Sequence, residues 1–253
     1  MKLELEDRVA LVTGASRGIG LGIATKLAAE GAKIALAARG ADALNAAGAA
    51  VGGGASVHVA DVTDPAAAAT LVHEVERQWG RLDILVCNVG SGASVPPGKE
   101  TAAEWSRVID LNLFATTNMI DAARPLMARG SGDRAIVCIS SIAGMAALGA
   151  PVTYYGAKAA VNATVRGLAR PLALEGIRIN AVAPGNILSA DGTWARKIAE
   201  NKAAVDDMLQ REVALRRLGT PEEIADVVAF LASPRAAFIT GSIVVADGGQ
   251  LRS

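Results

Sequence analysis

The sequence predicts an α/β protein with a doubly wound parallel sheet of about seven strands and helices on both faces. Short aliphatic and β-branched runs recur at residues 9–13, 33–38, 56–60, 82–88, 135–140, 177–183 and 242–246. Alanine-rich stretches long enough for helices lie between most of them, at 19–30, 65–79, 101–129 and 152–175. The runs are continuously apolar, which is typical of parallel strands that are buried on both faces.

The first predicted strand leads directly into a glycine-rich turn and then a helix. Residues 13–20 read TGASRGIG, so that Gly14, Gly18 and Gly20 are spaced Gly-x-x-x-Gly-x-Gly. Glycines let the backbone approach a pyrophosphate closely, and the helix N-terminus offers free N–H groups. A glycine-rich turn is often only a turn. Its position between a first strand and a first helix nevertheless indicates a dinucleotide site.

The end of the second strand indicates which dinucleotide is preferred. An acidic residue there would bind the adenosine ribose, whereas an arginine can neutralise a 2′-phosphate. The chain has Ala38 at the expected acidic position and Arg39 after it, and Arg17 in the glycine turn can reach the same phosphate. Each arginine alone is commonly a solvated surface residue. Together they favour NADP(H) over NAD(H).

Capping signals mark the starts of the later helices. Asp64 precedes a proline at a first helical position. The segments 101–104 and 220–223 fit capping boxes of the form Thr-x-x-Glu. Pro171 falls inside the predicted helix 152–175 and should kink it. We find no linker, repeat or composition break, and Gly52 to Gly54 form a turn, so residues 1–253 are predicted to be a single domain.

Composition narrows the range of partners. Formal net charge is zero, from 25 basic and 25 acidic residues, which does not favour nucleic acid or an anionic membrane surface. No apolar stretch approaches a membrane span, and the charged first residues do not fit a signal peptide, so we expect a cytoplasmic protein. Cys87 and Cys138 fall in apolar runs as buried thiols, and no metal-binding pattern is present.

The two tyrosines of the chain are adjacent, at Tyr154 and Tyr155, shortly before Lys158. On a helix, Tyr154 and Lys158 share a face at positions i and i+4. An ammonium group beside a phenol favours the phenolate, so we expect Lys158 to lower the pKa of Tyr154. The alternative from these residues alone is a core or interface aromatic beside a solvated lysine.

These motifs together resemble the short-chain dehydrogenase/reductase family, of the compact single-domain type with a Rossmann-type sheet. The resemblance covers essentially the whole chain, and its motifs follow the family's order: the turn at 13–20, Asp61 with Val62, Asn88 to Gly90, Asn112, Ser141, Tyr154 with Lys158, Pro184 with Gly185, and Asp247 to Gly249. It implies an oxidoreductase that transfers a hydride between a nicotinamide cofactor and a carbonyl or secondary alcohol.

The resemblance implies the catalytic set Asn112, Ser141, Tyr154 and Lys158. Ser141 lies 154 − 141 = 13 positions before Tyr154, which suits the family's spacing and selects it over Ser140. Tyr154 is then the acid/base, Lys158 lowers its pKa and binds the nicotinamide ribose, and Ser141 steadies the developing alkoxide. Asn112 is expected to hold a water that links Lys158 to solvent. For Tyr155 two roles stay open, lining the pocket or packing against a partner helix.

The resemblance also implies a set of cofactor contacts. They are Gly14, Ser16, Arg17, Gly18, Ile19 and Gly20 at the phosphates, Arg39 at the 2′-phosphate, Asp61 and Val62 at the adenine, Asn88 and Gly90 beside the adenosine ribose and the sheet, Tyr154 and Lys158 at the nicotinamide ribose, and Pro184, Gly185, Ile187 and Ser189 at the nicotinamide. Ile187 would donate its backbone N–H to the carboxamide. The sequence Cys87-Asn88-Val89-Gly90 departs from the family's usual Asn-Asn-Ala-Gly.

The segments expected to line the substrate pocket are 91–97, 142–152 and 188–207. They carry few charges and offer Val95, Pro96, Met145, Leu148 and Trp194, the last as a lid contact. Such a pocket suits a neutral ketone, aldehyde or keto ester.

The nearest subgroup by resemblance is the 3-oxoacyl-(acyl-carrier-protein) reductases. Carrier proteins are acidic and need a basic docking surface. Glu175 stands before Gly176, where that subgroup commonly has a basic residue, although Arg124 and Arg129 lie on a neighbouring helix. We therefore favour a reductase of small or medium carbonyl compounds.

Other classes fit less well. A non-catalytic dinucleotide-binding regulator could lose the Tyr154–Lys158 pair, which is intact here, and an epimerase or dehydratase would need a larger C-terminal region. His58 and His73 flank no obvious nucleophile, so a serine-hydrolase triad is not expected. The long helices rich in small residues, together with the strand around 243–246, suit a homo-oligomer, with dimer and tetramer both open.

Overall fold

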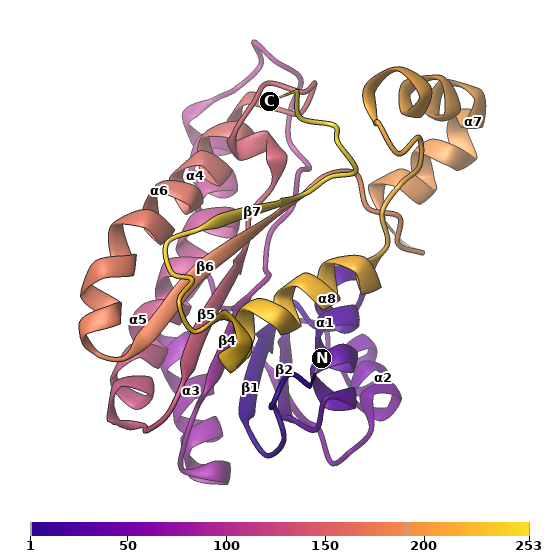
Figure 1. The fold of residues 1–253 in the computed structure, drawn as a ribbon. Coiled ribbons are helices and arrows are strands. Elements are labelled where there is room, and N and C mark those ends of the chain that lie inside the picture. The colour runs from indigo at the N-terminus through magenta and orange to yellow at the C-terminus, as the bar shows by residue number, and fades with distance from the viewer. Residues whose placement is uncertain (1, 191, 253) are drawn as a thin grey trace.

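The computed structural model describes residues 2–190 and 192–252, and its core is a parallel sheet. Residue 191, within the expected pocket segment 188–207, lies outside the described residues. In the described part of the chain the sheet has seven strands in the order β3-β2-β1-β4-β5-β6-β7 (Figure 1). They are β1 (Val9–Thr13), β2 (Lys33–Ala38), β3 (Ser56–Val59), β4 (Ile84–Cys87), β5 (Arg134–Ile139), β6 (Ile177–Pro184) and β7 (Ile243–Ala246). The predicted fold class is confirmed.

Helices cover both faces of the sheet. On one face, α1 (Gly18–Ala29), α2 (Ala41–Val51) and α8 (Pro221–Ala232) pack against side chains such as Ala10 and Val12 of β1. On the other face, α3 (Pro65–Trp79), α5 (Ala115–Arg129) and α6 (Val152–Leu174) pack against Val9 and Leu11. Alternate residues of one strand therefore serve two separate cores, which explains why the strands are apolar throughout.

The predicted helix 101–129 contains a local change of winding. It divides into α4 (Ala102–Ile109), a π-helical segment η1 (Asp110–Phe114) and α5. Such π segments are rare and frequently lie at functional sites. Asn112 is in the middle of this one.

The capping signals are largely confirmed. Asp64 accepts a hydrogen bond from the backbone N–H of Ala66 at 2.9 Å, and Thr220 with Glu223 forms a complete capping box. At α4 only half of the expected box forms, because the carboxylate of Glu104 turns away to other partners. Pro171 does not end α6, which continues to Leu174.

The segment that follows β6 differs most from expectation. The segment 188–207 was expected to line the pocket and no helix was predicted there, but Thr193–Glu212 forms helix α7, which stands away from the sheet (Figure 1). The helix is broken at Asn201, where φ is −158° and ψ is 84°, and the Asn201 side chain caps the second half by accepting from Ala204 N–H at 3.0 Å. Its apolar residues pack mainly on one another, around Val205, Leu209 and Val213.

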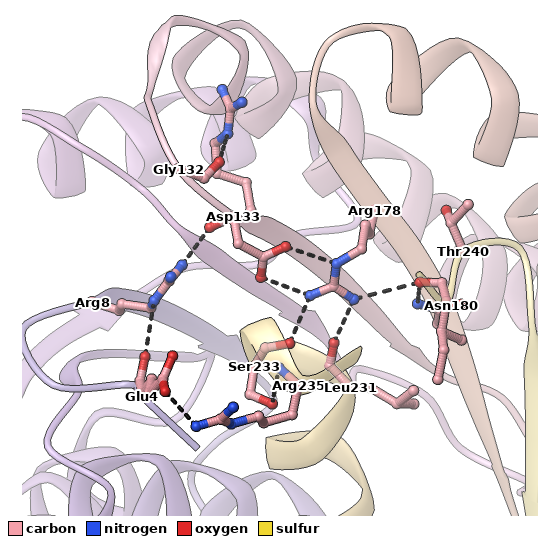
Figure 2. Close-up of polar contacts among 12 residues, drawn as sticks. Glu4, Arg8, Gly132, Asp133, Arg178, Asn180, Leu231, Ser233, Arg235 and Thr240 are labelled. Carbon is pink, nitrogen blue, oxygen red and sulfur yellow. Dashed lines mark hydrogen bonds and ion pairs between the residues drawn. The ribbon is translucent and has the colours of Figure 1, made fainter. Parts of the chain in front are cut away.

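A buried ion pair joins elements at the amino ends of β5 and β6 (Figure 2). The Arg178 guanidinium donates two hydrogen bonds to the Asp133 carboxylate, of 2.9 and 2.8 Å. The same guanidinium donates to the carbonyls of Leu231 at 2.8 Å and Ser233 at 3.1 Å, at the end of α8. This network therefore ties two strands to a helix, at the opposite end of the sheet from the glycine turn.

Candidate active site

The strand order reverses between β1 and β4, and the glycine turn lies at the carboxyl end of this crevice. Asn88, just after β4, braces the turn. Its backbone N–H donates to Thr13 Oγ1, and its side-chain amide donates to the carbonyls of Thr13 and Gly14, each bond 3.1 Å long. Both side-chain N–H groups are thus used on the turn itself rather than directed at a ribose.

The glycine turn fits a pyrophosphate. Gly14 has a φ of 63°, in the left-handed region, and a Cβ there would lie 2.9 Å from the Asn88 amide nitrogen. A Cβ on Gly20 would lie 2.3 Å from the carbonyl oxygen of Gly14. Helix α1 begins at Gly18, so the free N–H groups of its first turn and its positive dipole end lie at the glycine turn. Only glycines allow this close packing around a backbone cradle.

Arg39 lies at the end of β2 beside Asp61 at the end of β3. Arg39 is exposed, and its Nη1 is 3.7 Å from Asp61 Oδ2. Partial burial acts to raise the pKa of Asp61, but hydrogen bonds from Thr63 and the charge of Arg39 outweigh it and lower that pKa. Val62 is buried in the core, with 3% of its surface exposed. A contact of residue 62 with an adenine ring would therefore fall to its main chain.

Tyr154, Ser141 and Lys158 come together beyond the end of β5. The Lys158 Nζ atom lies 5.8 Å from the centre of the Tyr154 ring and donates to the carbonyl of Ile139 at 2.8 Å. Lys158 is almost completely buried, and this burial lowers its pKa to about 8. Lysine and tyrosine therefore share one face of α6, as the i, i+4 spacing predicts.

We expected the pKa of Tyr154 to be lowered, and this prediction was wrong. Burial raises the pKa of Tyr154 above its ordinary value, and a hydrogen bond with Ser141 only partly opposes this. The Lys158 ammonium is directed to Ile139 and not to the phenol oxygen. In this arrangement the phenol of Tyr154 is held in its protonated form at neutral pH.

The adjacent serines have different surroundings. Ser140 is buried and donates to Asn162 Oδ1 at 2.6 Å, so its hydroxyl serves the packing of α6 against β5. Ser141 is half-buried, accepts from the N–H of Ala143 at 3.1 Å, and lies beside the Tyr154 hydroxyl. The geometry therefore brings Ser141, rather than Ser140, to the phenol.

Asn112 lies in the π segment and is fully buried. Its amide donates to the carbonyls of Ser91 at 3.1 Å and Val108 at 3.0 Å, while its Oδ1 accepts from Ser91 N–H at 3.0 Å. Both of its donors are used, and Oδ1 keeps one lone pair for a further donor. Gly90 lies between Asn112 and Lys158, because a Cβ there would be 2.7 Å from Asn112 Oδ1 and 3.0 Å from Lys158 Nζ.

The loop after β6 brings Ser189 to the glycine turn. A Cβ on Gly18 would lie 3.7 Å from Ser189 Oγ, although the two residues are far apart in sequence. Pro184 pairs with β7, and Gly185 donates its N–H to the carbonyl of Ala246 at 3.0 Å. Ile187 forms a parallel bridge in which its two neighbours make the hydrogen bonds to Gly219. Its own N–H therefore points to the other side, where a ligand can accept it.

Two of the expected pocket segments lie near Tyr154. A Cβ on Gly92 would be 3.8 Å from the Tyr154 ring, so the loop 91–97 approaches that ring at Gly92. Met145 is 45% exposed, on the loop that leads from Ser141 to α6. Trp194 stays a predicted lid contact. It packs within the apolar cluster of α7, with Lys197 Nζ 4.5 Å above its ring.

A polar network that the sequence did not reveal holds the loop 91–97. Ser94 Oγ is 2.7 Å from both Glu104 Oε1 and Thr153 Oγ1, next to Tyr154. The Arg107 guanidinium donates hydrogen bonds to the Glu104 carboxylate and to the carbonyl of Ala93. The hydrogen bonds from Arg107 and Ser94 lower the pKa of Glu104 to about 2. In the sequence, the one signal for this network was Glu104, which was predicted only as part of a helix cap.

The cysteines face each other on neighbouring strands. Cys87 and Cys138 are directly paired in the register of β4 and β5, and both are buried, as expected. Their mutual hydrogen bond and burial hold the pKa of Cys87 well above its usual value. Over the described ranges, we find no cluster of three or more His, Cys, Asp or Glu side chains placed to hold a metal, and no helix long and apolar enough to span a membrane.

Comparisons with known proteins agree with this geometry. A family model described as enoyl-(acyl carrier protein) reductase matches residues 14–250. An uncharacterised oxidoreductase of Methylorubrum extorquens is 38% identical over 97% of this chain and 98% of its own length. The 3-oxoacyl-[acyl-carrier-protein] reductase FabG of Escherichia coli is 35% identical over 98% of this chain and 99% of its own. The Pseudomonas aeruginosa RhlG/NADP active-site complex has a TM-score of 0.91, 32% identity and coverage of 98% of both chains.

The sheet, the glycine turn and these relatives define an NAD(P)-dependent oxidoreductase that acts on alcohol or ketone groups. The chain belongs to the short-chain dehydrogenase/reductase family, as its motifs indicated.

Proposed function

We propose that this enzyme reduces a neutral small or medium carbonyl compound, or oxidises the matching secondary alcohol, with NADP(H) and with Tyr154 as general acid/base. The meeting of Tyr154, Ser141 and buried Lys158 supports this most strongly. The bound nicotinamide supplies or accepts the hydride. The chain's own residues supply binding, orientation and the proton.

Each residue of the proposed set has a distinct task. Tyr154, protonated at neutral pH, donates its proton to the substrate oxygen during reduction. Ser141 donates a hydrogen bond to that oxygen and stabilises its developing charge. The Lys158 ammonium lies 5.8 Å from the centre of the Tyr154 ring, and at that distance its charge helps to stabilise the phenolate that remains after proton transfer. The free lone pair of Asn112 Oδ1 can hold a water on the path from Lys158 to solvent.

The proposed cofactor contacts are those expected from the sequence, with two refinements. Asn88 acts by holding the turn, and Val62 through its main chain. Arg39 and Arg17 support NADP(H), and two structural neighbours of 32% identity are described as NADP- or NADPH-bound.

Replacing Arg39 with alanine should weaken the use of NADPH without weakening the use of NADH. A charge-assisted hydrogen bond contributes about 1.5–3 kcal/mol, so kcat/KM for NADPH should fall about 10- to 100-fold. The kcat/KM for NADH should stay the same or rise, because NADH has no 2′-phosphate. Steady-state kinetics with both cofactors measures this, and Arg129→Ala, an exposed arginine paired with Glu76, is the control. Equal losses with both cofactors would contradict the assignment.

The substrate is proposed to be free rather than bound to a carrier protein. Several relatives are named for acyl-carrier-protein substrates. However, Arg124 forms an ion pair with Glu175, and Arg129 Nη2 lies 2.6 Å from Glu76 Oε1. Neither arginine therefore offers an unpaired charge to an acidic carrier.

The experiment compares carbonyl compounds in matched forms. A 3-oxoacyl group is presented as a simple ester and on an acyl carrier protein, beside a panel of neutral ketones and aldehydes, each with NADPH. We expect the free compounds to be reduced with at least the kcat/KM of the carrier-bound form. A strong preference for the carrier would support the 3-oxoacyl-(acyl-carrier-protein) reductase alternative. Tight NADPH binding without turnover of any compound would support a non-catalytic regulator.

We further propose that the chain works as a single domain in a cytoplasmic homo-oligomer. Trp105 on α4 and Phe114 in η1 are exposed aromatic residues, and a hollow between α5 and α6 lies beside Ile120 and Leu168. Val245 on the edge strand β7 is also exposed. Such apolar faces suit contact with further copies, and light scattering would distinguish a dimer from a tetramer.

A further inference from the structure

Tyr155 makes an unusual connection within the site. Its hydroxyl oxygen accepts hydrogen bonds from the backbone N–H groups of Leu148 and Ala150, each 2.6 Å long. These residues belong to the loop 145–151, which joins the turn after Ser141 to the start of α6. The loop therefore begins beside one proposed catalytic residue and ends beside another.

The geometry of the loop suits one oxygen acceptor. Gly149 separates the two donors and has a φ of 77°, which other residues rarely adopt. Backbone N–H groups that converge in this way form a small concavity that attracts an electron-rich atom. A phenol oxygen has two lone pairs, so these two donors use both of them. Tyr155 thus satisfies two backbone groups that would otherwise need water or another partner.

We propose that Tyr155 is a positioning residue that shapes the substrate pocket by clamping the loop 145–151 to α6. Tyr154 is the preceding residue on the same helical turn, so the clamp fixes the loop relative to the proposed acid. Met145 and Leu148, which were expected to line the pocket, lie on the clamped segment. This role rests on the proposed function, because it concerns the pocket in which the carbonyl compound binds.

The loop 91–97, the other segment expected to line the pocket beside Tyr154, is held independently. The loop 91–97 is fixed to α4 and α6 through Ser94, Glu104 and Thr153, with Arg107 gripping Glu104. None of these bonds involves Tyr155. Loss of the Tyr155 hydroxyl should therefore loosen one wall and leave the other in place. The expected consequence is a change in which substrates bind, rather than a uniform loss of activity.

The test is Tyr155→Phe, which removes only the acceptor oxygen. Amide hydrogen exchange should accelerate about tenfold or more over residues 146–150 and stay unchanged over 91–99, because two hydrogen bonds are lost on one wall only. KM for a bulky keto ester should rise about tenfold, while kcat for a small ketone changes less than about threefold. The NADPH dissociation constant, from fluorescence titration, should stay within about twofold.

Two outcomes would overturn the clamp. One is unchanged exchange at Leu148 and Ala150. The other is an equal loss of kcat for large and small ketones without any change in KM. Because exchange is measured on the protein without substrate, it tests the clamp even if no carbonyl compound is turned over. Failure of the wild-type enzyme to reduce any ketone would refute the proposed function alone. A thermal melt of the variant within a few degrees of wild type confirms that it is folded.

Discussion

Replacing Tyr154 with phenylalanine should lower kcat for ketone reduction by about 10²- to 10⁴-fold, the range expected for loss of a general acid. The substitution removes one oxygen from a side chain whose ring is packed beside Gly92 and Lys158, so the fold should be retained. NADPH binding should change little, because the glycine turn and Arg39 supply most of the proposed contacts. Single-turnover absorbance of NADPH separates the chemical step from binding.

The adjacent substitution provides the matched comparison for this result. Tyr155→Phe removes the same atom one residue away and is expected to raise KM, whereas Tyr154→Phe is expected to lower kcat. Retention of more than about a tenth of wild-type kcat in Tyr154→Phe would exclude Tyr154 as the acid. A fall of kcat in Tyr155→Phe with normal turnover in Tyr154→Phe would exchange the two roles.

Patterns that act over a few residues predicted the sheet and the outline of the site. Continuous apolar runs identified the strands, and the spacing of glycines identified the turn before α1. The count from Tyr154 to Lys158 placed both on one helix face, because helical geometry requires it. The choice of Ser141 over Ser140 agrees with the different partners of the two hydroxyls.

Burial and long-range partners could not be predicted in the same way. The pKa of Tyr154 depends on how completely the phenol is desolvated, which the sequence does not specify. Helix α7 was not predicted, because its apolar residues, such as Leu209, pack mainly on one another and not against the sheet. Tyr155 had no assignment because its partners are backbone N–H groups, which every residue except proline possesses.

The partners of the buried Arg178 side chain could not be predicted from the sequence pattern either. Arg178 stands in a strand whose other residues, except Asn180, are apolar, and 7% of its surface is exposed. Its guanidinium is satisfied by Asp133 and by carbonyls that come from the end of α8 (Figure 2). Those partners are distant in sequence. Without them, burying a charged side chain in a strand would cost free energy.

Replacing Asp133 with alanine should therefore destabilise the protein by about 3 kcal/mol or more, since removing one partner of a buried pair leaves an uncompensated charge. Urea unfolding followed by circular dichroism measures the change. Asp207→Ala, which breaks an exposed pair with Arg211, is the control and should cost less than about 1 kcal/mol. A loss in Asp133→Ala as small as in the control would contradict the role of the pair.

A second variant separates the buried charge from the lost contact. In Asp133→Ala combined with Arg178→Leu, no unpaired guanidinium remains, and part of the stability should return, because apolar replacements of buried ion pairs are often neutral. A double variant no more stable than Asp133→Ala would instead show that the carbonyl bonds of Arg178 to Leu231 and Ser233, which are lost only in the double variant, contribute as much as the unpaired charge costs. Since this network lies at the amino ends of the strands, kcat at 25 °C should stay near wild type in every folded variant.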